Sequence, residues 1–285
     1  MSRAAGRIPC QKISKSLDFS QGLCYIFHAA AGKYTTGSVF MENETARPSK
    51  TGLTPYLECE KWQIYALLMT AGGCFGAFTY SIRGGVFCNA QTGNFVLLAM
   101  SLGNGDWSQA LYYLIPISAY CLGAFVSEAA EEKIGKLHLI RWETLLVLLE
   151  MLAALFLGFL PETAPVQITQ VLINFICSMQ YNTFRQAQGI PMATTFCTNH
   201  IRQVGVGLYR TLAGRDRAAA RKALAHLGML SAFVAGGVLT AFACGRFLGK
   251  AVWLAEIPLG LALADLLRAD LGKERADLEQ VPRGH

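Results

Sequence analysis

The chain has 285 residues, of which 53% are hydrophobic and 15% are charged, and its formal net charge is +6. Soluble domains carry about 25% charged residues, so this composition argues against a soluble globular protein. The basic residues fall between long apolar stretches, where positive charge sets the orientation of membrane helices. Their placement therefore argues against nucleic-acid binding.

Residues 1–60 are predicted to form an N-terminal extension. Its one apolar patch, 23–31, is short, is interrupted by His28 and follows basic residues, as in a signal peptide. No clean cleavage pattern follows the patch. Two readings stay open: a disordered extension, or a native start at Met41, which begins a short polar lead into the first span.

The rest of the chain is predicted to cross a membrane six times. A helix needs about 20 residues to span the bilayer core. Two of the six stretches contain one acid each, Glu150 or Glu256, and the others contain no charge. The predicted fold is an all-α membrane domain over 61–268 with a cytoplasmic tail at 269–285. The stretches are 62–82, 107–127, 144–161, 163–184, 227–245 and 251–264.

Segment 84–105 is long enough to be a seventh span, but glycines and amides interrupt it. If it crosses, the basic loops 129–142 and 185–226 both move to the outer face, against the usual charge bias. We therefore expect 84–105 to dip into the membrane without crossing, with both chain ends in the cytoplasm. An eight-span alternative, with both motif segments crossing, stays open.

Four matches in the same order favour an internal repeat, with halves at about 61–162 and 163–268. The first match is that each polar motif directly follows a span that ends in arginine, at Arg83 or at Arg185. Asn94 and Asn199 end similar motifs 105 positions apart, and Ser118–Ala124 resembles Ser231–Gly237 at an offset of 113. The membrane glutamates lie 106 positions apart. Three crossings in each half would make the halves inverted repeats, as in many secondary transporters.

The two polar motifs are the predicted solute or ion pathway. Amides and hydroxyls in a membrane face protein or a water-filled cavity, because exposure to lipid is costly. The alternative is that these side chains only tie helices together. The predicted pathway residues are Asn89, Gln91, Thr92, Gly93 and Asn94 in the first half, and Thr194, Thr195, Thr198 and Asn199 in the second.

Two pairs of charged residues are further candidates. Glu150 and Glu256 lie inside spans, where an acid is a candidate for proton or ion coupling; a hydrogen-bonded structural role is the equal alternative. Arg83 and Arg185 end the spans that precede the motifs, and we favour an anchoring role in the headgroup region. Gly72 and Gly76 form a GxxxG pattern that permits close helix approach.

The sequence predicts neither a cofactor nor a metal site. Its nine cysteines are scattered and form no CxxC pair, which argues against zinc and against a disulfide framework. Anionic lipid is a candidate partner of the basic segment 200–222, although we favour a plain orientation signal as the explanation of its charge. A homo-oligomer is compatible with the sequence.

Two segments carry a family resemblance: Arg83-Gly-Gly-Val-Phe-Cys-Asn-Ala-Gln-Thr-Gly-Asn94 and Gln188-Gly-Ile-Pro-Met-Ala-Thr-Thr-Phe-Cys-Thr-Asn199. Together they resemble the YoaK-like family of bacterial membrane proteins over about residues 60–268. In that family the second motif commonly ends in Thr-Gly-Asn, and this chain lacks the glycine. The resemblance implies a protein of the bacterial cytoplasmic membrane and implies no substrate.

The sequence thus favours a small secondary transporter or channel for a small polar solute or ion. The main alternative is a non-transporting scaffold or accessory subunit, which a stoichiometric partner in purification would indicate. An enzyme is not expected, because the sequence has no GxSxG, no HExxH and no phosphate-binding glycine loop.

Overall fold

The computed structural model describes residues 56–134, 140–278 and 282. The predictions for the apolar patch at 23–31 and for a start at Met41 concern residues outside this range.

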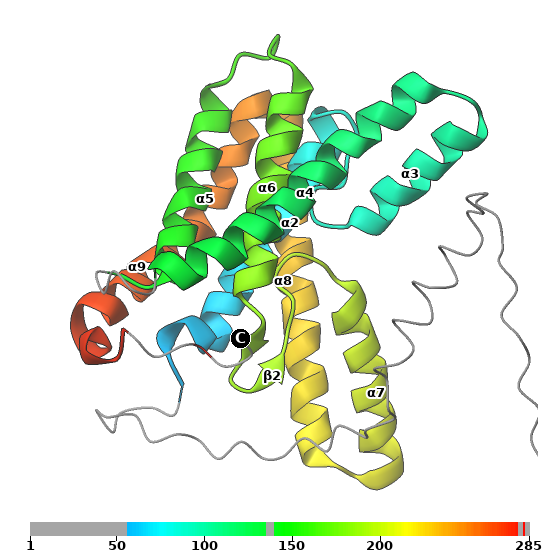
Figure 1. The fold of residues 1–285 in the computed structure, drawn as a ribbon. Coiled ribbons are helices and arrows are strands. Elements are labelled where there is room, and N and C mark those ends of the chain that lie inside the picture. Colours follow the sequence, from blue (N-terminus) through cyan, green and yellow to red (C-terminus); the bar gives the residue numbers. More distant parts are fainter. Residues whose placement is uncertain (1–55, 135–139, 279–281, 283–285) are drawn as a thin grey trace, which may run out of the picture. The chain divides into compact units, whose positions relative to one another are not determined.

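The described chain is helical apart from one short hairpin, which confirms the predicted all-α class (Figure 1). The hairpin pairs Gln186 with Pro191 in antiparallel register, and the sequence did not predict it. The elements are η1 (Glu58–Glu60), α2 (Trp62–Ile82), α3 (Gln91–Gly103), α4 (Trp107–Ile134), α5 (Trp142–Phe159), α6 (Val166–Thr183), β1 (Gln186–Ala187), β2 (Ile190–Pro191), α7 (Thr198–Gly214), α8 (Arg217–Phe247), η3 (Leu248–Ala255), α9 (Glu256–Arg268), η4 (Ala269–Lys273) and η5 (Arg275–Asp277).

Three helical stretches of the described chain are long and apolar enough to cross a membrane. Large apolar side chains also cover their outer surfaces: Phe125, Phe159 and Phe242 are 72%, 70% and 74% exposed. Water penalises such surface by about 25 cal/mol per Å², whereas lipid does not. These features support a multi-pass membrane protein. The stretches are Trp107–Glu131, Trp142–Phe159 and Arg217–Lys273.

Glycines allow two helix pairs to approach closely. Helix α2 packs along α8, and α4 packs along α6. A Cβ atom at Gly236 of α8 would lie 2.1 Å from the carbonyl oxygen of Thr70 on α2. A Cβ atom at Gly123 of α4 would lie 2.3 Å from the carbonyl oxygen of Phe175 on α6. Neither contact leaves room for a methyl group, so these two glycines set the separation of their helices.

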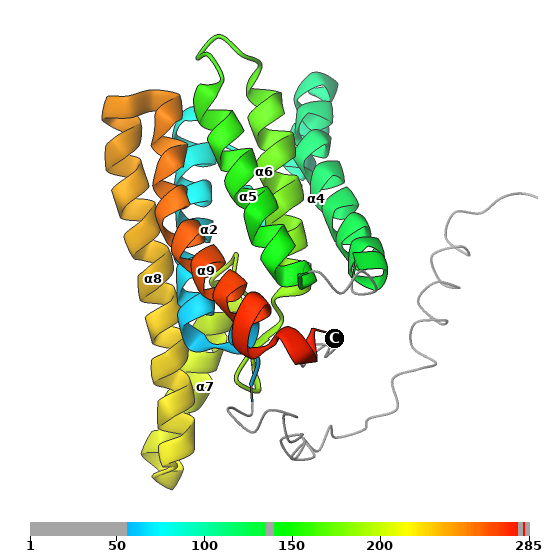
Figure 2. The same cartoon turned by 90° about the vertical axis from the view of Figure 1, so that its left-hand side faces the viewer.

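Helices α3 and α7 fold back on the helices that follow them. Helix α3 packs on α4, and α7 packs on α8. In both views the α3–α4 turn lies at the top and the α7–α8 turn at the bottom (Figures 1 and 2). The 13 residues of α3 cover about 20 Å, which is less than the roughly 30 Å of a bilayer core.

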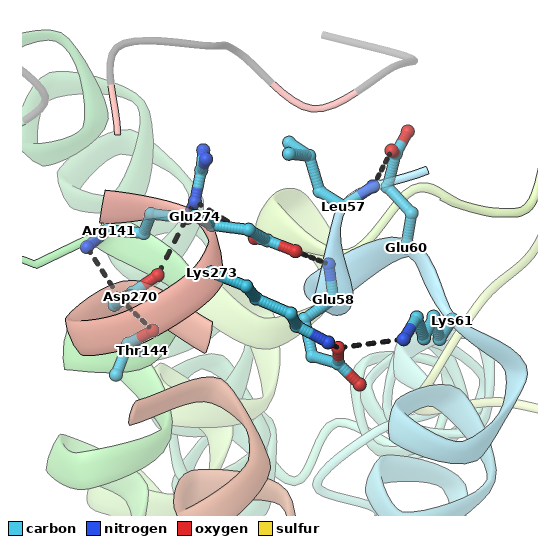
Figure 3. Close-up of polar contacts among 9 residues, drawn as sticks. All are labelled: Leu57, Glu58, Glu60, Lys61, Arg141, Thr144, Asp270, Lys273 and Glu274. Carbon is cyan, nitrogen blue, oxygen red and sulfur yellow. Dashed lines mark hydrogen bonds and ion pairs between the residues drawn. The ribbon is translucent and has the colours of Figure 1, made fainter. Parts of the chain in front are cut away.

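A polar network joins three distant segments at one end of the helices (Figure 3). The buried carboxyl group of Asp270 pairs with the Arg141 guanidinium at 3.4 Å and accepts a hydrogen bond from the Arg141 N–H. Glu274 accepts a hydrogen bond of 2.8 Å from the N–H of Glu58. The network therefore fastens the segment before α2 to the segment after α9. The residues drawn are Leu57, Glu58, Glu60, Lys61, Arg141, Thr144, Asp270, Lys273 and Glu274.

Candidate functional site

The first polar loop, residues 83–90, turns back along α2. Gly84 and Gly85 begin the turn with φ angles of +87° and +67°, which glycine adopts without strain. Further on, Asn89 is buried and its amide donates a 3.1 Å hydrogen bond to the carbonyl oxygen of Gly72. Gly72 lies halfway along α2. The loop thus reaches the middle of that helix and returns through α3.

Asn94 holds this loop in shape. Its amide nitrogen donates to the Phe87 carbonyl oxygen at 2.7 Å, and its amide oxygen accepts from the Phe87 N–H at 3.2 Å. Asn94 is fully buried and also bonds to Gln91 at 3.0 Å. Gln91 donates to Asn174 of α6 at 2.7 Å. Asn94 is therefore a positioning residue, and Gln91 links the loop to the neighbouring helix.

The second polar loop, residues 184–197, reaches the same part of α2. After the β1–β2 hairpin, the carbonyl oxygen of Thr194 lies 2.9 Å from the position that a Cβ would take at Gly72. Thr194 and Thr195 are fully buried. Among the described residues, the Thr194 hydroxyl has no hydrogen-bond partner. Both loops thus contact one glycine at the middle of α2.

The first loop also reaches the middle of α6. The thiol of Cys88 lies against the thiol of Cys177, and Cys177 lies near the midpoint of α6. Both cysteines are free and buried.

The residues predicted to form the pathway differ in their burial. Asn89, Asn94, Thr194 and Thr195 are buried, Gln91, Gly93 and Asn199 are half-buried, and Thr92 and Thr198 are exposed.

Glu150 lies at the middle of α5 and is completely buried. Neither oxygen of its carboxyl group has a hydrogen-bond partner among the described residues. An acid in such surroundings requires a proton, a cation or water as a companion.

Glu256 is half-buried and lies where η3 becomes α9. Contacts of Gly158 with Trp253, and of Gly260 with Met151, show that α5 and the η3–α9 segment run antiparallel. Glu256 is therefore level with residue 155 of α5, about 8 Å along the helices from Glu150. The two acids thus lie on adjacent antiparallel segments, at different levels along them.

The two arginines at helix ends have different surroundings. Arg83 is only 3% exposed, follows α2 directly and pairs with Glu162 at 3.2 Å. Arg185 is 32% exposed and pairs with Glu128 at 3.1 Å. Both side chains bind protein groups, so each holds a helix end against a neighbouring segment.

Sequence reasoning missed the polar face of α6. Gln170 donates to the Arg83 carbonyl oxygen at 2.8 Å, and Asn174 accepts from Gln91. Gln180 donates to the Leu68 carbonyl oxygen of α2 at 3.4 Å. Gln170 and Asn174 lie one helical turn apart within an uncharged span. That spacing, which marks one face of a helix, was the signal available in the sequence.

Comparison of the sequence with models of protein families assigns the chain to a family. A family model described as "Protein of unknown function (DUF1275)" matches residues 64–264. The chain belongs to this family. The match includes both polar loops, Glu150 and Glu256, and it confirms the YoaK-like resemblance. No curated protein and no solved structure matches the chain.

Proposed function

We propose that this member of the DUF1275 family is a small secondary transporter or channel for a small polar solute or ion. The pathway runs between the two polar loops. The observation that carries the proposal is their meeting at Gly72, at the middle of α2. The unpartnered carboxyl group of Glu150, at the middle of α5, is a second buried polar feature. Interrupted backbone at the membrane midplane is typical of transporter binding sites.

The proposal includes six crossings, made by α2, α4, α5, α6, α8 and the η3–α9 segment. Both chain ends then lie in the cytoplasm of a bacterial cell, under the cytoplasmic membrane. The distribution of Lys and Arg supports this orientation. The basic loops 129–142 and 185–226 both fall on the inner side, while the turns at 103–106 and 161–165 carry no basic residue.

Helix packing supports an inverted repeat. The first helix of each proposed half, α2 or α6, packs along the long helix of the other half, α8 or α4. Gly123 and Gly236 occupy matching positions, 113 residues apart, in the two similar segments. They face carbonyl oxygens of Phe175 and Thr70, which lie 105 residues apart. The offset of 105 is the same as that between Asn94 and Asn199.

Charge around α7 supports an interaction with anionic lipid. Six basic side chains on α7, on α8 and in the turn between them are exposed. Each adds about 1 kcal/mol of attraction near an anionic leaflet. In the proposed orientation they lie at the inner headgroups. They are Arg202, Arg210, Arg215, Arg217, Arg221 and Lys222.

Topology tests the inverted arrangement directly. Asn104→Cys and Ala213→Cys place thiols beside the two hairpin turns and avoid Gly105 and Arg215, whose φ angles are +72° and +49°. In a Cys121→Ser background, a membrane-impermeant maleimide should label the first from outside and the second only after the membrane is opened. Labelling of both from one side would refute the inverted repeat.

Flux tests the pathway. Purified protein in liposomes is screened with a panel of small polar solutes, with internal pH followed by a trapped dye. Glu150→Gln should abolish any proton-coupled flux, and Arg268→Gln, 79% exposed on α9, should leave it unchanged. If Asn94→Ala and Asn199→Ala stay folded and leave the flux unchanged, the pathway is wrong. A protein without flux that co-purifies with a stoichiometric partner would indicate the scaffold role.

A further inference from the structure

An open pocket of about 510 Å³ lies beside the second polar loop, at the end of α6. One side of the pocket is apolar: the rings of Tyr181 and Phe196 lie 4.8 Å apart. The lining also includes the polar residues Asn182, Arg185 and Asn199. The pocket is lined by Tyr181, Asn182, Arg185, Pro191, Met192, Ala193, Phe196 and Asn199.

Arg185 is the one charged residue that the described structure places in the lining of this pocket. The Nη2 atom of Arg185 bonds to Glu128 at 3.1 Å, and its Nε atom donates to the carbonyl oxygen of Asn182 at 2.6 Å. Among the described residues no hydrogen bond reaches Nη1 of Arg185. Arg202 donates to the Asn199 amide oxygen at 3.0 Å. One guanidinium group thus lines the pocket, and a second bonds to a residue of the lining. The carboxylate that pairs with Arg185 is 70% exposed.

A second pocket, of about 820 Å³ along α4, has a different character. Its lining includes Leu111, Leu114, Ile115 and Leu122 and contains no charged residue. Such a groove suits lipid chains. The pocket at Arg185 instead combines a cation with an apolar wall, which is the arrangement that orients an amphipathic anion.

We propose that the pocket at Arg185 binds a small organic monoanion. Its carboxylate lies against Arg185, and its apolar part lies against Tyr181 and Phe196. The inference rests on the proposed function, since it makes the pocket the entrance of the pathway and names the class of solute. Continuity supports this: Ala193 lines the pocket, and the next residue, Thr194, contacts Gly72 at the middle of α2.

Benzoate is the probe, with benzamide as its neutral isostere and acetate as the anion without an apolar body. Binding to the full chain in phosphatidylcholine nanodiscs is measured by calorimetry. We expect benzoate to bind more tightly than acetate and benzamide. Arg185→Gln should weaken benzoate binding about tenfold to a hundredfold, because it removes a hydrogen bond to a charged group. Arg268→Gln, 79% exposed on α9, is the matched control.

Glu128→Gln is expected to act in the opposite direction. Removing the competing carboxylate should tighten benzoate binding several-fold and leave benzamide unchanged. Because a misfolded variant would not bind more tightly, this result cannot come from loss of structure. Equal binding of benzoate and benzamide, or an Arg185→Gln variant with wild-type affinity, would overturn the proposal.

Two further outcomes separate the sources of the anion and the two proposals. If nanodiscs containing phosphatidylglycerol abolish benzoate binding, a lipid headgroup is the occupant and the small-solute class is wrong. If benzoate does not bind, yet Asn94→Ala abolishes the flux of another solute, the pathway stands and the inferred solute class falls. If Asn94→Ala and Asn199→Ala leave flux unchanged while benzoate binds at Arg185, the pocket stands without the pathway.

Discussion

Replacing Gly236 by alanine tests one of the close contacts between α2 and α8. The added methyl group would lie 2.1 Å from the Thr70 carbonyl oxygen and 3.2 Å from the sulfur of Cys74. The first of these is a backbone atom, so no change of rotamer relieves the clash. Helices α2 and α8 must move apart, and every contact along this pair lengthens.

The expected loss follows from two opposing effects. Overpacking of a tight interior contact costs about 1–3 kcal/mol. Replacing glycine by alanine within a helix returns about 1 kcal/mol. The variant should therefore lose up to about 2 kcal/mol of unfolding free energy. Gly228→Ala, eight residues earlier on α8 with no atom within 4 Å, should gain up to about 1 kcal/mol.

The assay is unfolding of the purified chain by SDS titration, followed by tryptophan fluorescence. Both variants receive the same methyl group on the same helix, so effects of composition and helix propensity cancel between them. Gly123→Ala, which faces Phe175 across α4 and α6, should resemble Gly236→Ala. Equal stabilities of Gly236→Ala and Gly228→Ala would show that the α2–α8 separation is not set by this glycine.

Three other predictions concern the loop and the network at the helix ends. Asn94→Ala should cost about 1–3 kcal/mol by leaving the Phe87 backbone groups unpaired, and Thr92→Ala should cost little; SDS titration compares them. Arg141→Gln should cost about 3–5 kcal/mol because Asp270 stays buried without its charge partner, whereas a loss below 1 kcal/mol would contradict this. Burial raises the pKa of Glu58, but the nearby charges of Lys273 and Lys61 outweigh burial and hold that pKa below its ordinary value. The Glu58 carboxylate therefore stabilises the fold above its ordinary pKa, and this stabilisation is lost as pH falls through the folded-state pKa. Glu58→Gln should then lower stability at pH 7 and match the wild type at low pH in a pH series of the same titration.

Local patterns predicted the features that depend on neighbouring residues. Uncharged stretches predicted the long helices, and amides flanked by glycines predicted the loop that turns back after α2. Features that join distant segments left no comparable pattern. Asp270 and Arg141 lie 129 positions apart, and neither is unusual in its own stretch. Their pairing depends on which helix ends meet, which sequence spacing does not report.

The glycines of α2 show how a correct pattern can carry an incomplete explanation. The Gly72–Gly76 spacing predicted close approach of a helix. In the structure, these glycines accommodate the two loops: Gly72 faces Thr194, and Gly76 faces the amide of Asn89. Gly73 makes the helix contact, since a Cβ atom there would lie 2.0 Å from the Phe233 carbonyl oxygen of α8. Glycines on one face of a helix allow the backbone of another segment to come close. That segment can be a loop as well as a helix.

Within the proposed function, the two ends of the pathway are in different states. Beside the second loop, the pocket is open and Arg185 is 32% exposed. Beside the first loop, Arg83 is 3% exposed and pairs with Glu162. The acids differ in the same way, since Glu150 is buried and Glu256 is half-buried.

Alternating access requires such a difference between inverted halves. If the halves exchange their conformations, the open end closes and the closed end opens around a fixed centre. The contacts at Gly72 would be that centre, because both loops meet there. Under the proposed exchange, the Arg83–Glu162 pair at the closed end would separate, and it would therefore act against the outward-open state. A charge pair at the closed end and a pocket at the open end are therefore two consequences of a single asymmetric state of the proposed repeat.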